Sequence, residues 1–172
     1  MKYYEQYRIL HNTKKYGISG DHAADKIVPV IPEGTKSLLD YGAGQSNLAA
    51  LLSRKAGIAD VCAYDPCVRG RDKKPERSFD FVTCTDVLEH VPEEELDDLL
   101  TEVWGYQEKG AVFQIALREA AHVLPNGENC HCTVHPADWW ERKLKSVFNE
   151  VIEIPSLSIT HSVACFLVRS SS

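Results

Sequence analysis

The stretch SLLDYGAGQSNLAALL, residues 37–52, decides the fold of this 172-residue chain. A short apolar run leads into Asp40, Gly42 and Gly44 follow, and leucines then recur at the spacing of one helical face. This order predicts a strand, a glycine-rich turn and a helix that ends at Gly57. Glycines between a strand and a helix let a ligand lie against bare backbone, close to the N–H groups of the helix. The turn is therefore the first candidate for a binding site.

Short apolar strands and amphipathic helices alternate along the rest of the chain. The alternation predicts a three-layer α/β fold, with helices on both faces of a mainly parallel sheet. No helix separates the last two strand-like runs, so we expect them to form an antiparallel pair at one edge. The expected strands are residues 35–42, 59–65, 79–86, 110–117, 150–154 and 162–169, and the expected helices are residues 3–13, 20–31, 46–57, 91–106 and 136–148.

The composition is that of one globular domain, in which we expect residues 1–34 to form a helical lid and residues 35–172 the core. The formal net charge is −6 and the basic residues are scattered, so a polynucleotide partner is not expected. No apolar run approaches the roughly 20 residues that cross a bilayer, and the first residues lack the apolar core of a signal peptide. Six cysteines scattered through the chain indicate reduced, buried thiols and a cytoplasmic location.

Two phosphate-binding motifs fit the glycine turn poorly. A dinucleotide fingerprint requires a third glycine where Asn47 stands, and a P-loop requires a lysine that the turn lacks. A second acid, Asp65, ends the next strand 21 positions after Gly44. A carboxylate there is placed to accept both ribose hydroxyls of a nucleoside. The alternative is a solvated aspartate that caps a turn before Pro66.

The stretch FDFVTCTDVLEHV, residues 79–91, supplies the candidates for catalysis. Its strand ends near Thr85 and Asp86, and Glu89 and His90 precede the next helix. An acid and a histidine beside a bound nucleoside suit proton removal from an acceptor, so Asp86 and His90 are the catalytic candidates. The alternative is that Asp86 and Glu89 hydrogen-bond to the backbone and His90 caps the helix.

The segments LLDYGAGQSN, AYDP and FDFVTCTDVLEHV together resemble the class I S-adenosylmethionine-dependent methyltransferases over about residues 36–168. The first motif of that family, Asp/Glu-x-Gly-x-Gly-x-Gly, is matched by Asp40, Gly42 and Gly44, with Ser46 in place of the last glycine. Asp65 matches the acid that holds the ribose, and residues 87–91 match a VLEHV-type stretch. The resemblance implies a Rossmann-like core that binds S-adenosylmethionine through Asp40, Gly42, Gly44, Ser46, Asn47, Asp65, Pro66, Thr85, Asp86 and Tyr16.

That resemblance implies methyl transfer to a small-molecule or nucleotide acceptor. The alternative is an inactive cofactor-binding module or an accessory subunit. The chain departs from the family after Asp65, where only about a dozen residues precede the next strand. We therefore expect the family's third strand and the helix before it to be shortened or missing. The stretch RGRDKKPER, residues 69–77, is interpreted as a solvated loop, with Asp72 the alternative contact for adenine.

The least regular segments are expected to bind the acceptor. Tyr3, Tyr4, Tyr7 and Tyr16 either form a lid over the cofactor or dock the first helix on the sheet. The segment of residues 117–144 is a long polar loop leading into a helix, and such loops in small domains are more often functional than idle. Its acceptor-binding candidates are His122, Asn129, His131, His135 and Trp139.

The segment CHCTVH, residues 130–135, raises the question of zinc. Cys130, Cys132 and His135 are possible ligands, with His131 or His122 as a fourth. Cys-x-Cys differs from the usual Cys-x2-Cys spacing, and no second paired motif follows. The sequence therefore predicts no metal site.

Overall fold

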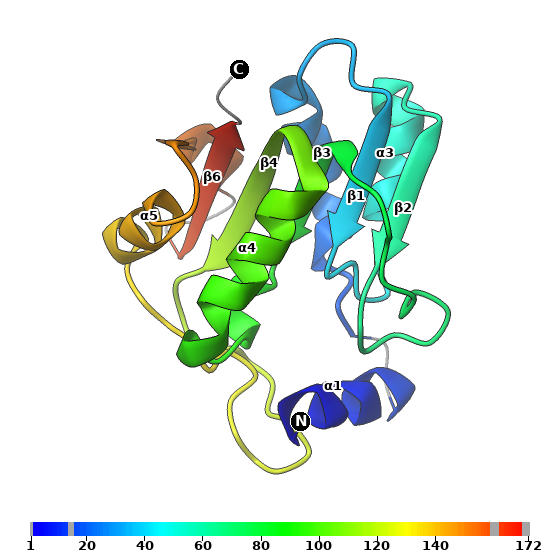
Figure 1. Ribbon diagram of the computed structural model, residues 1–172. Coiled ribbons are helices and arrows are strands. Elements are labelled where there is room, and N and C mark those ends of the chain that lie inside the picture. Colours follow the sequence, from blue (N-terminus) through cyan, green and yellow to red (C-terminus); the bar gives the residue numbers. More distant parts are fainter. Residues whose placement is uncertain (1, 14–15, 159–161, 170–172) are drawn as a thin grey trace.

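The computed structural model describes residues 2–13, 16–158 and 162–169, which form a six-stranded sheet with the order β2-β1-β3-β4-β6-β5. Strands β1 to β4 run parallel, and β6 runs antiparallel to both β4 and β5 (Figure 1). The mainly parallel sheet with an antiparallel edge is therefore confirmed. The strands are β1 (Ser37–Tyr41), β2 (Asp60–Tyr64), β3 (Phe79–Thr85), β4 (Gln107–Ala116), β5 (Glu150–Glu153) and β6 (Val163–Arg169).

Helices cover both faces of the sheet, and α1 lies apart from them beyond the carboxyl ends of the parallel strands (Figure 1). Side chains of α4 and α5 pack on one face, and side chains of α2 and α3 pack on the other. The α-helices are α1 (Lys2–Thr13), α2 (Ala24–Ile27), α3 (Leu48–Ala56), α4 (Leu96–Tyr106) and α5 (Ala137–Lys145), and the 3-10 turns are η1 (Ser19–His22), η2 (Val28–Val30), η3 (Leu88–His90), η4 (Glu93–Glu95) and η5 (Pro155–Leu157).

Alternation along the strands builds the two apolar layers. In β1, Leu38 packs with α2 and α3, whereas the next residue, Leu39, packs with α4 and α5. Trp140 of α5 is fully buried in the second of these layers. Burying one such large apolar side chain contributes roughly 1.5–3 kcal/mol to folding. The sheet is thus buried on both faces, which explains why its strands read as nearly continuous apolar runs.

Two expected helices differ in detail. Residues 20–31 form three short helical pieces instead of one helix. Helix α2 ends at Ile27 because Pro29 has no N–H with which to continue the α-helical hydrogen bonds. The helix expected from residue 91 begins as a 3-10 turn, and α4 itself starts at Leu96. Helix α3 ends as predicted, with Gly57 in the left-handed conformation at φ 70°.

The segment between β2 and β3 contains no helix or strand over residues 65–78. Strand β2 is consequently the edge of the sheet. The predicted shortening of the region that carries the third strand in the class I methyltransferases is therefore confirmed.

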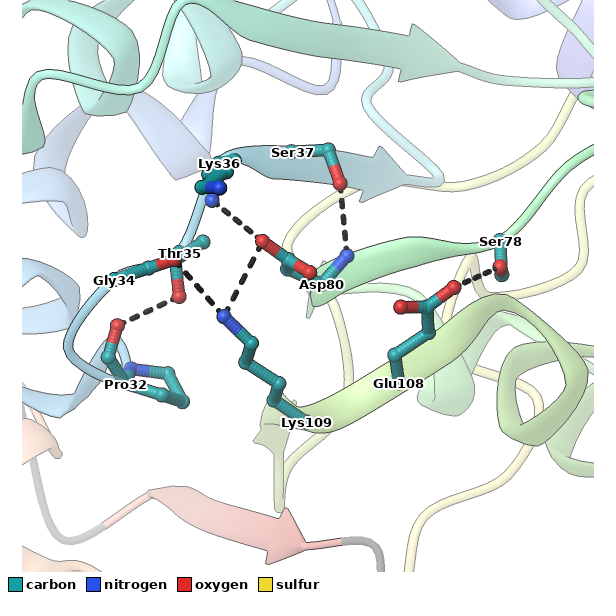
Figure 2. A network of polar contacts seen from close by, with 9 residues as sticks. All are labelled: Pro32, Gly34, Thr35, Lys36, Ser37, Ser78, Asp80, Glu108 and Lys109. Carbon is teal, nitrogen blue, oxygen red and sulfur yellow. Dashed lines mark hydrogen bonds and ion pairs between the residues drawn. The ribbon is translucent and has the colours of Figure 1, made fainter.

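The amino end of the sheet is closed by a polar network around Asp80 of β3 (Figure 2). Its carboxylate accepts the N–H of Lys36 at 2.5 Å and lies 3.4 Å from the Lys109 ammonium. Lys109 also donates to the carbonyl of Gly34 at 2.9 Å, and the N–H of Asp80 donates to the Ser37 hydroxyl at 2.9 Å. The N–H of Lys36, followed by the charge of Lys109, lowers the pKa of Asp80 against the opposing effect of burial.

All six cysteines are free thiols. Cys67, Cys84, Cys130 and Cys165 are buried, as expected, whereas Cys132 is exposed. Within the described ranges, the structure has no helix of the length and apolar character needed to cross a membrane.

Candidate active site

A cavity of about 650 Å³ lies between α1 and the carboxyl ends of the parallel strands. It falls where β2 and β3 diverge to opposite sides of β1, the point at which open α/β sheets bind ligands. Its volume is in the range of pockets that hold cofactors and small substrates. The sequence-predicted residues that line it are Tyr16, Gly42, Gly44, Ser46, Asp65, Pro66, Thr85, Asp86, His90, His122 and His131.

The two glycines of the turn are required by protein neighbours. Gly42 and Gly44 have φ values of 70° and 52°, a region that side chains disfavour. A Cβ atom on Gly42 would collide with the side chain of Val87. A Cβ atom on Gly44 would lie 2.5 Å from the carbonyl oxygen of Gly17. The glycines therefore allow the stretch after β3 and the segment after α1 to close on the turn.

Asp65 and Arg71 clamp the glycine turn through hydrogen bonds to its backbone. One Asp65 carboxylate oxygen accepts the N–H of Gly44 at 2.8 Å, and the other accepts the N–H of Cys67 at 2.8 Å. The guanidinium of Arg71 donates to the carbonyls of Gly44 at 2.9 Å and Ser46 at 2.8 Å. Each Asp65 oxygen keeps a second lone pair, so the carboxylate can still accept hydroxyl groups.

The role of Arg71 was missed by the sequence analysis, because it lies in the charged stretch 69–77 that was interpreted as solvated. Its neighbour Asp72 is exposed and accepts the N–H of Gly70 at 3.0 Å. The sequence offers no signal that separates the one arginine that reaches inward from the charged residues around it.

Asp40 lies beneath the turn and does not line the cavity. It is almost fully buried, and the Thr83 hydroxyl donates to its carboxylate at 2.9 Å. Burial nonetheless raises the pKa of Asp40 to about 7. Asn47 is also outside the cavity, because its N–H and its amide group bond to Asp21 at 2.5 and 3.4 Å.

His90 is held in one tautomer by its surroundings. Its Nδ1 lies 2.9 Å from the carbonyl oxygen of Cys130 and 2.8 Å from the hydroxyl of Tyr7. The Tyr7 hydroxyl donates to the same carbonyl at 2.6 Å. A carbonyl oxygen only accepts, so Nδ1 carries the proton and Nε2 keeps a free lone pair. Burial lowers the pKa of His90 to about 3, and the ring is therefore neutral at pH 7.

The acceptor candidates of the long loop separate into two groups. His131 faces the cavity with its ring centre 4.7 Å from that of His90, and its Nδ1 donates to the Arg118 carbonyl at 2.5 Å. His122 also lines the cavity. Asn129 shapes the loop instead, because its amide oxygen accepts the N–H of His131 at 2.9 Å.

His135 and Trp139 lie outside the cavity. Their rings stack on one another with centres 3.9 Å apart, and His135 pairs with Glu93 at 2.9 Å. The start of α5 directs these two side chains toward each other, and the structure gives them no part in the cavity.

Helix α1 lies over the cavity and packs on the loops around it. It does not dock on the sheet itself. Tyr7 and Leu10 pack in a small apolar cluster with residues of the loops that follow β2 and β4. The side chain of Gln45 donates to the His11 carbonyl at 2.8 Å and accepts the N–H of Tyr16 at 3.2 Å. The covering residues end at His22, because α2 packs in the sheet layers, so the covering segment is shorter than residues 1–34.

Glu89 is a further polar residue at this end of the sheet that the sequence analysis assigned only to backbone bonding. One carboxylate oxygen, Oε1, does accept the N–H of Ala116 at 2.7 Å. Its other oxygen, Oε2, completes no hydrogen bond within the described part of the chain. Burial, followed by the charge of Asp86, raises the pKa of Glu89 well above its usual value, and nearby backbone N–H groups offset this only in part.

We compared the chain with known protein families and structures to identify its family. A model of the methyltransferase domain matches residues 5–156. No curated protein sequence matches the chain. The fold is similar to an O-methyltransferase family protein from Burkholderia thailandensis, with a TM-score of 0.62 and 16% identity over 87% of this chain and 56% of that one. The chain thus spans just over half the length of that protein.

Two other similar structures contain ligands. Magnesium protoporphyrin IX methyltransferase from Synechocystis, with bound S-adenosylmethionine, has a TM-score of 0.60 and 15% identity over 87% of this chain and 79% of that one. The 1,6-didemethyltoxoflavin-N1-methyltransferase from Burkholderia thailandensis, with bound 1,6-didemethyltoxoflavin and S-adenosylhomocysteine, has a TM-score of 0.58 and 13% identity over 88% and 80% of the two chains. The family match covers most of the chain, and the chain belongs to the methyltransferase-domain family.

Proposed function

We propose that this chain transfers the methyl group of S-adenosylmethionine to a small-molecule or nucleotide acceptor inside the covered cavity. The observation that carries the proposal is the clamped glycine turn with the Asp65 carboxylate beside it, both opening into one cavity of about 650 Å³. The family assignment and the ligands bound to the two similar structures agree with this cofactor.

The residues at the turn fit the chemistry of the cofactor. The free lone pairs of Asp65 suit the two ribose hydroxyls, and Gly42 and Gly44 line the same cavity. A sulfonium cation is attracted by the ring faces of tyrosines and by carboxylates. Tyr16 and Asp86 line the same cavity and provide both kinds of group.

S-adenosylmethionine supplies an activated methyl group with a good leaving group, so the protein mainly has to align the acceptor and exclude water. Helix α1 and its loop contacts cover one side of the cavity, which limits the access of water. Asp86, His90, His122 and His131 then form the wall that faces an acceptor. The neutral His90 ring presents a free Nε2 lone pair for a polar acceptor group.

The backbone at Asp86 supports its assignment to the site. It is the one non-glycine residue of the described chain with a positive φ, at 54°. Its N–H donates to the Gln114 carbonyl at 2.9 Å, which fixes the residue at the end of β3. Such unfavourable conformations cluster at functional sites. We propose that Asp86 orients the cofactor and the acceptor.

A small acceptor is favoured by the covered cavity and by the net charge of −6. A polynucleotide would need an open, basic groove along the cavity, and the chain has neither a block of lysines nor one of arginines. The free state of all six cysteines agrees with a reducing, cytoplasmic environment.

Calorimetric titration with S-adenosylmethionine tests the proposal. We expect one site per chain in the wild-type protein. Asp65→Asn should weaken binding by at least ~10-fold, because each hydrogen bond to a charged group contributes about 1.5–3 kcal/mol. Asp72→Asn is the matched control, since this exposed acid lies in the same loop and outside the cavity.

Two results would contradict the proposal. One is the absence of binding at millimolar cofactor, and the other is equal affinity of the wild-type protein and Asp65→Asn. Transfer itself is measured with methyl-labelled cofactor and pools of small metabolites and nucleotides. Label that moves to an acceptor supports an enzyme, whereas cofactor binding without transfer to any pool would favour the binding-module alternative.

A further inference from the structure

Three polar side chains converge on the acceptor side of the cavity. Glu89, His90 and His131 each place one potential ligand atom so that these atoms lie within 4.8 Å of one another. Among the described residues, this is the one group of three or more His, Cys, Asp or Glu side chains with that geometry. His90 and His131 line the cavity, and Glu89 is buried directly behind them.

The Nδ1 atoms of both imidazole rings lie against backbone carbonyl oxygens. The Nδ1 atom of His90 lies 2.9 Å from the Cys130 carbonyl, and the Nδ1 atom of His131 lies 2.5 Å from the Arg118 carbonyl. Each Nδ1 therefore carries its proton, and each Nε2 is free with a lone pair. Histidines that bind metals commonly donate their other N–H to a carbonyl or carboxylate, which fixes the ring.

Glu89 gives the independent observation that points to a ligand. Its carboxylate has no exposed surface, and none of the lysines and arginines that the structure describes forms an ion pair with it. Its Oε2 atom completes no hydrogen bond with the described residues. A buried carboxylate without a partner is costly, and a bound cation offsets that cost directly. The hydrogen bonds among Tyr7, Cys130 and His90 provide a partner for Nδ1 of His90. They provide none for Oε2 of Glu89.

The cysteine-based zinc site considered from the sequence has no comparable geometry. Cys130 and Cys132 belong to no converging group of possible ligands within the described residues. His135 is turned toward Glu93 and Trp139. His131 is the only residue of CHCTVH that joins the cluster, and it does so with partners from the turn after β3.

We propose that Glu89, His90 and His131 bind one divalent first-row transition-metal ion, such as Mn²⁺, Co²⁺ or Zn²⁺, with its open coordination positions toward the cavity. Two imidazoles and one carboxylate suit this class of ion, and three protein ligands leave room for another donor. The open positions would take an oxygen or nitrogen atom of the methyl acceptor. This assignment of the ion to acceptor binding rests on the proposed function, whereas the metal site itself does not.

The test is calorimetric titration of the chelator-treated, dialysed protein with MnCl₂, CoCl₂ and ZnCl₂, supported by the visible absorption of bound Co²⁺. We expect one ion per chain. Glu89→Gln keeps an oxygen for the Ala116 N–H but removes the charge, and His131→Ala removes a partly exposed ligand. Each should weaken metal binding by at least ~10-fold, the lower limit seen when only a supporting residue is lost. His122→Ala is the matched control, because it removes a histidine from the same cavity but not from the cluster.

The metal site is wrong if no ion of the three binds at millimolar concentration. It is also wrong if His131→Ala binds as tightly as His122→Ala, and His131→Ala decides the matter should Glu89→Gln fail to fold. Titration with S-adenosylmethionine in the presence of chelator separates this inference from the proposed function. Cofactor binding without metal binding removes the metal site alone, and metal binding without cofactor binding removes the proposed function alone.

Discussion

The acids at the two ends of the sheet have pKa values that are shifted in opposite directions. At the amino end, Asp80 receives the Lys36 N–H and the Lys109 charge, and its pKa is lowered. At the carboxyl end, Asp40 and Glu89 are more deeply buried and form no ion pair with the residues that the structure describes, and burial raises the pKa of each. The contacts of Asp80 stabilise the folded state, whereas the burial of Asp40 and Glu89 lowers its stability when these groups are ionised. Such costs are typical of sites that are completed by ligands.

Arg71 provides the largest expected effect on this comparison, because it is the cation that holds the glycine turn at the carboxyl end. Arg71→Ala removes the donors to the Gly44 and Ser46 carbonyls, so we expect the free energy of unfolding to fall by about 1.5–3 kcal/mol. S-adenosylmethionine should also bind more weakly. Chemical denaturation and calorimetry measure the two effects. Arg69→Ala, an exposed neighbour, is the control, and an equal loss in both variants would contradict the clamp.

Asp40 tests whether the raised pKa is a cost of the carboxyl end. Its folded-state pKa of about 7 lies above the ordinary value of 3.8, so the folded state binds the extra proton between these limits. Stability should therefore fall as pH rises from about 4 to about 7 and then level off. The shift in pKa corresponds to about 4 kcal/mol, but one side-chain atom of the asparagine would stay buried without a hydrogen-bond partner, as Asp40 Oδ2 is, which costs about 1–3 kcal/mol. Asp40→Asn should therefore remove this fall and raise the free energy of unfolding at pH 8 by roughly 2 kcal/mol. Unfolding curves between pH 4 and pH 8 measure it, and an unchanged slope in the variant would refute the assignment.

Asp80 should show the opposite sign at the amino end. Its lowered pKa means that the stability it contributes is present above its ordinary pKa and is lost as pH falls through the folded-state value. Asp80→Asn should cost about 1 kcal/mol near pH 7, because the charge-assisted bonds are replaced by neutral ones. Cofactor affinity should remain as in the wild type. A loss of cofactor binding in this variant would show that the two ends are not independent.

The smallest expected effect on stability comes from Tyr7, through which α1 contacts His90. Tyr7→Phe removes the donor to the Cys130 carbonyl and should lower the free energy of unfolding by about 0.5–1.5 kcal/mol. Tyr106→Phe is the control, because it removes a similar bond to the Pro75 carbonyl and Tyr106 belongs to α4 and not to α1. Both variants should lose comparable stability in denaturation curves, but Tyr7→Phe alone should weaken cofactor binding. Equal cofactor affinity in the two variants would count against α1 as a cover.

The fold could be predicted because most of its strands and helices have a recognisable pattern within a few consecutive residues. The apolar runs of β1 and β3 and the glycine that ends α3 lie where the sequence predicted them. The end of α2 at Ile27 also has a local cause, since Pro29 removes a backbone donor.

The sequence predicted the part of the site that lies directly at the ends of adjacent parallel strands. Gly44 and Asp65 come together because the carboxyl ends of adjacent parallel strands meet at one edge. The contact of His131 with His90 joins residues 41 positions apart through an irregular loop, and no periodicity predicts it. Trp139 was expected in the cavity because it lies off the buried stripe of its helix, but its ring stacks on His135 instead.

A crystal structure of the protein grown with S-adenosylhomocysteine is the most direct test of the central claim, that the carboxyl end of the sheet is a cofactor site. We predict that the ribose hydroxyls lie within hydrogen-bond distance of Asp65 and that the sulfur faces the wall formed by Asp86 and His90. A complex in which the ligand lies outside the cavity would contradict the account. So would a complex in which Asp65 keeps only its bonds to Gly44 and Cys67 and makes no contact with the ribose.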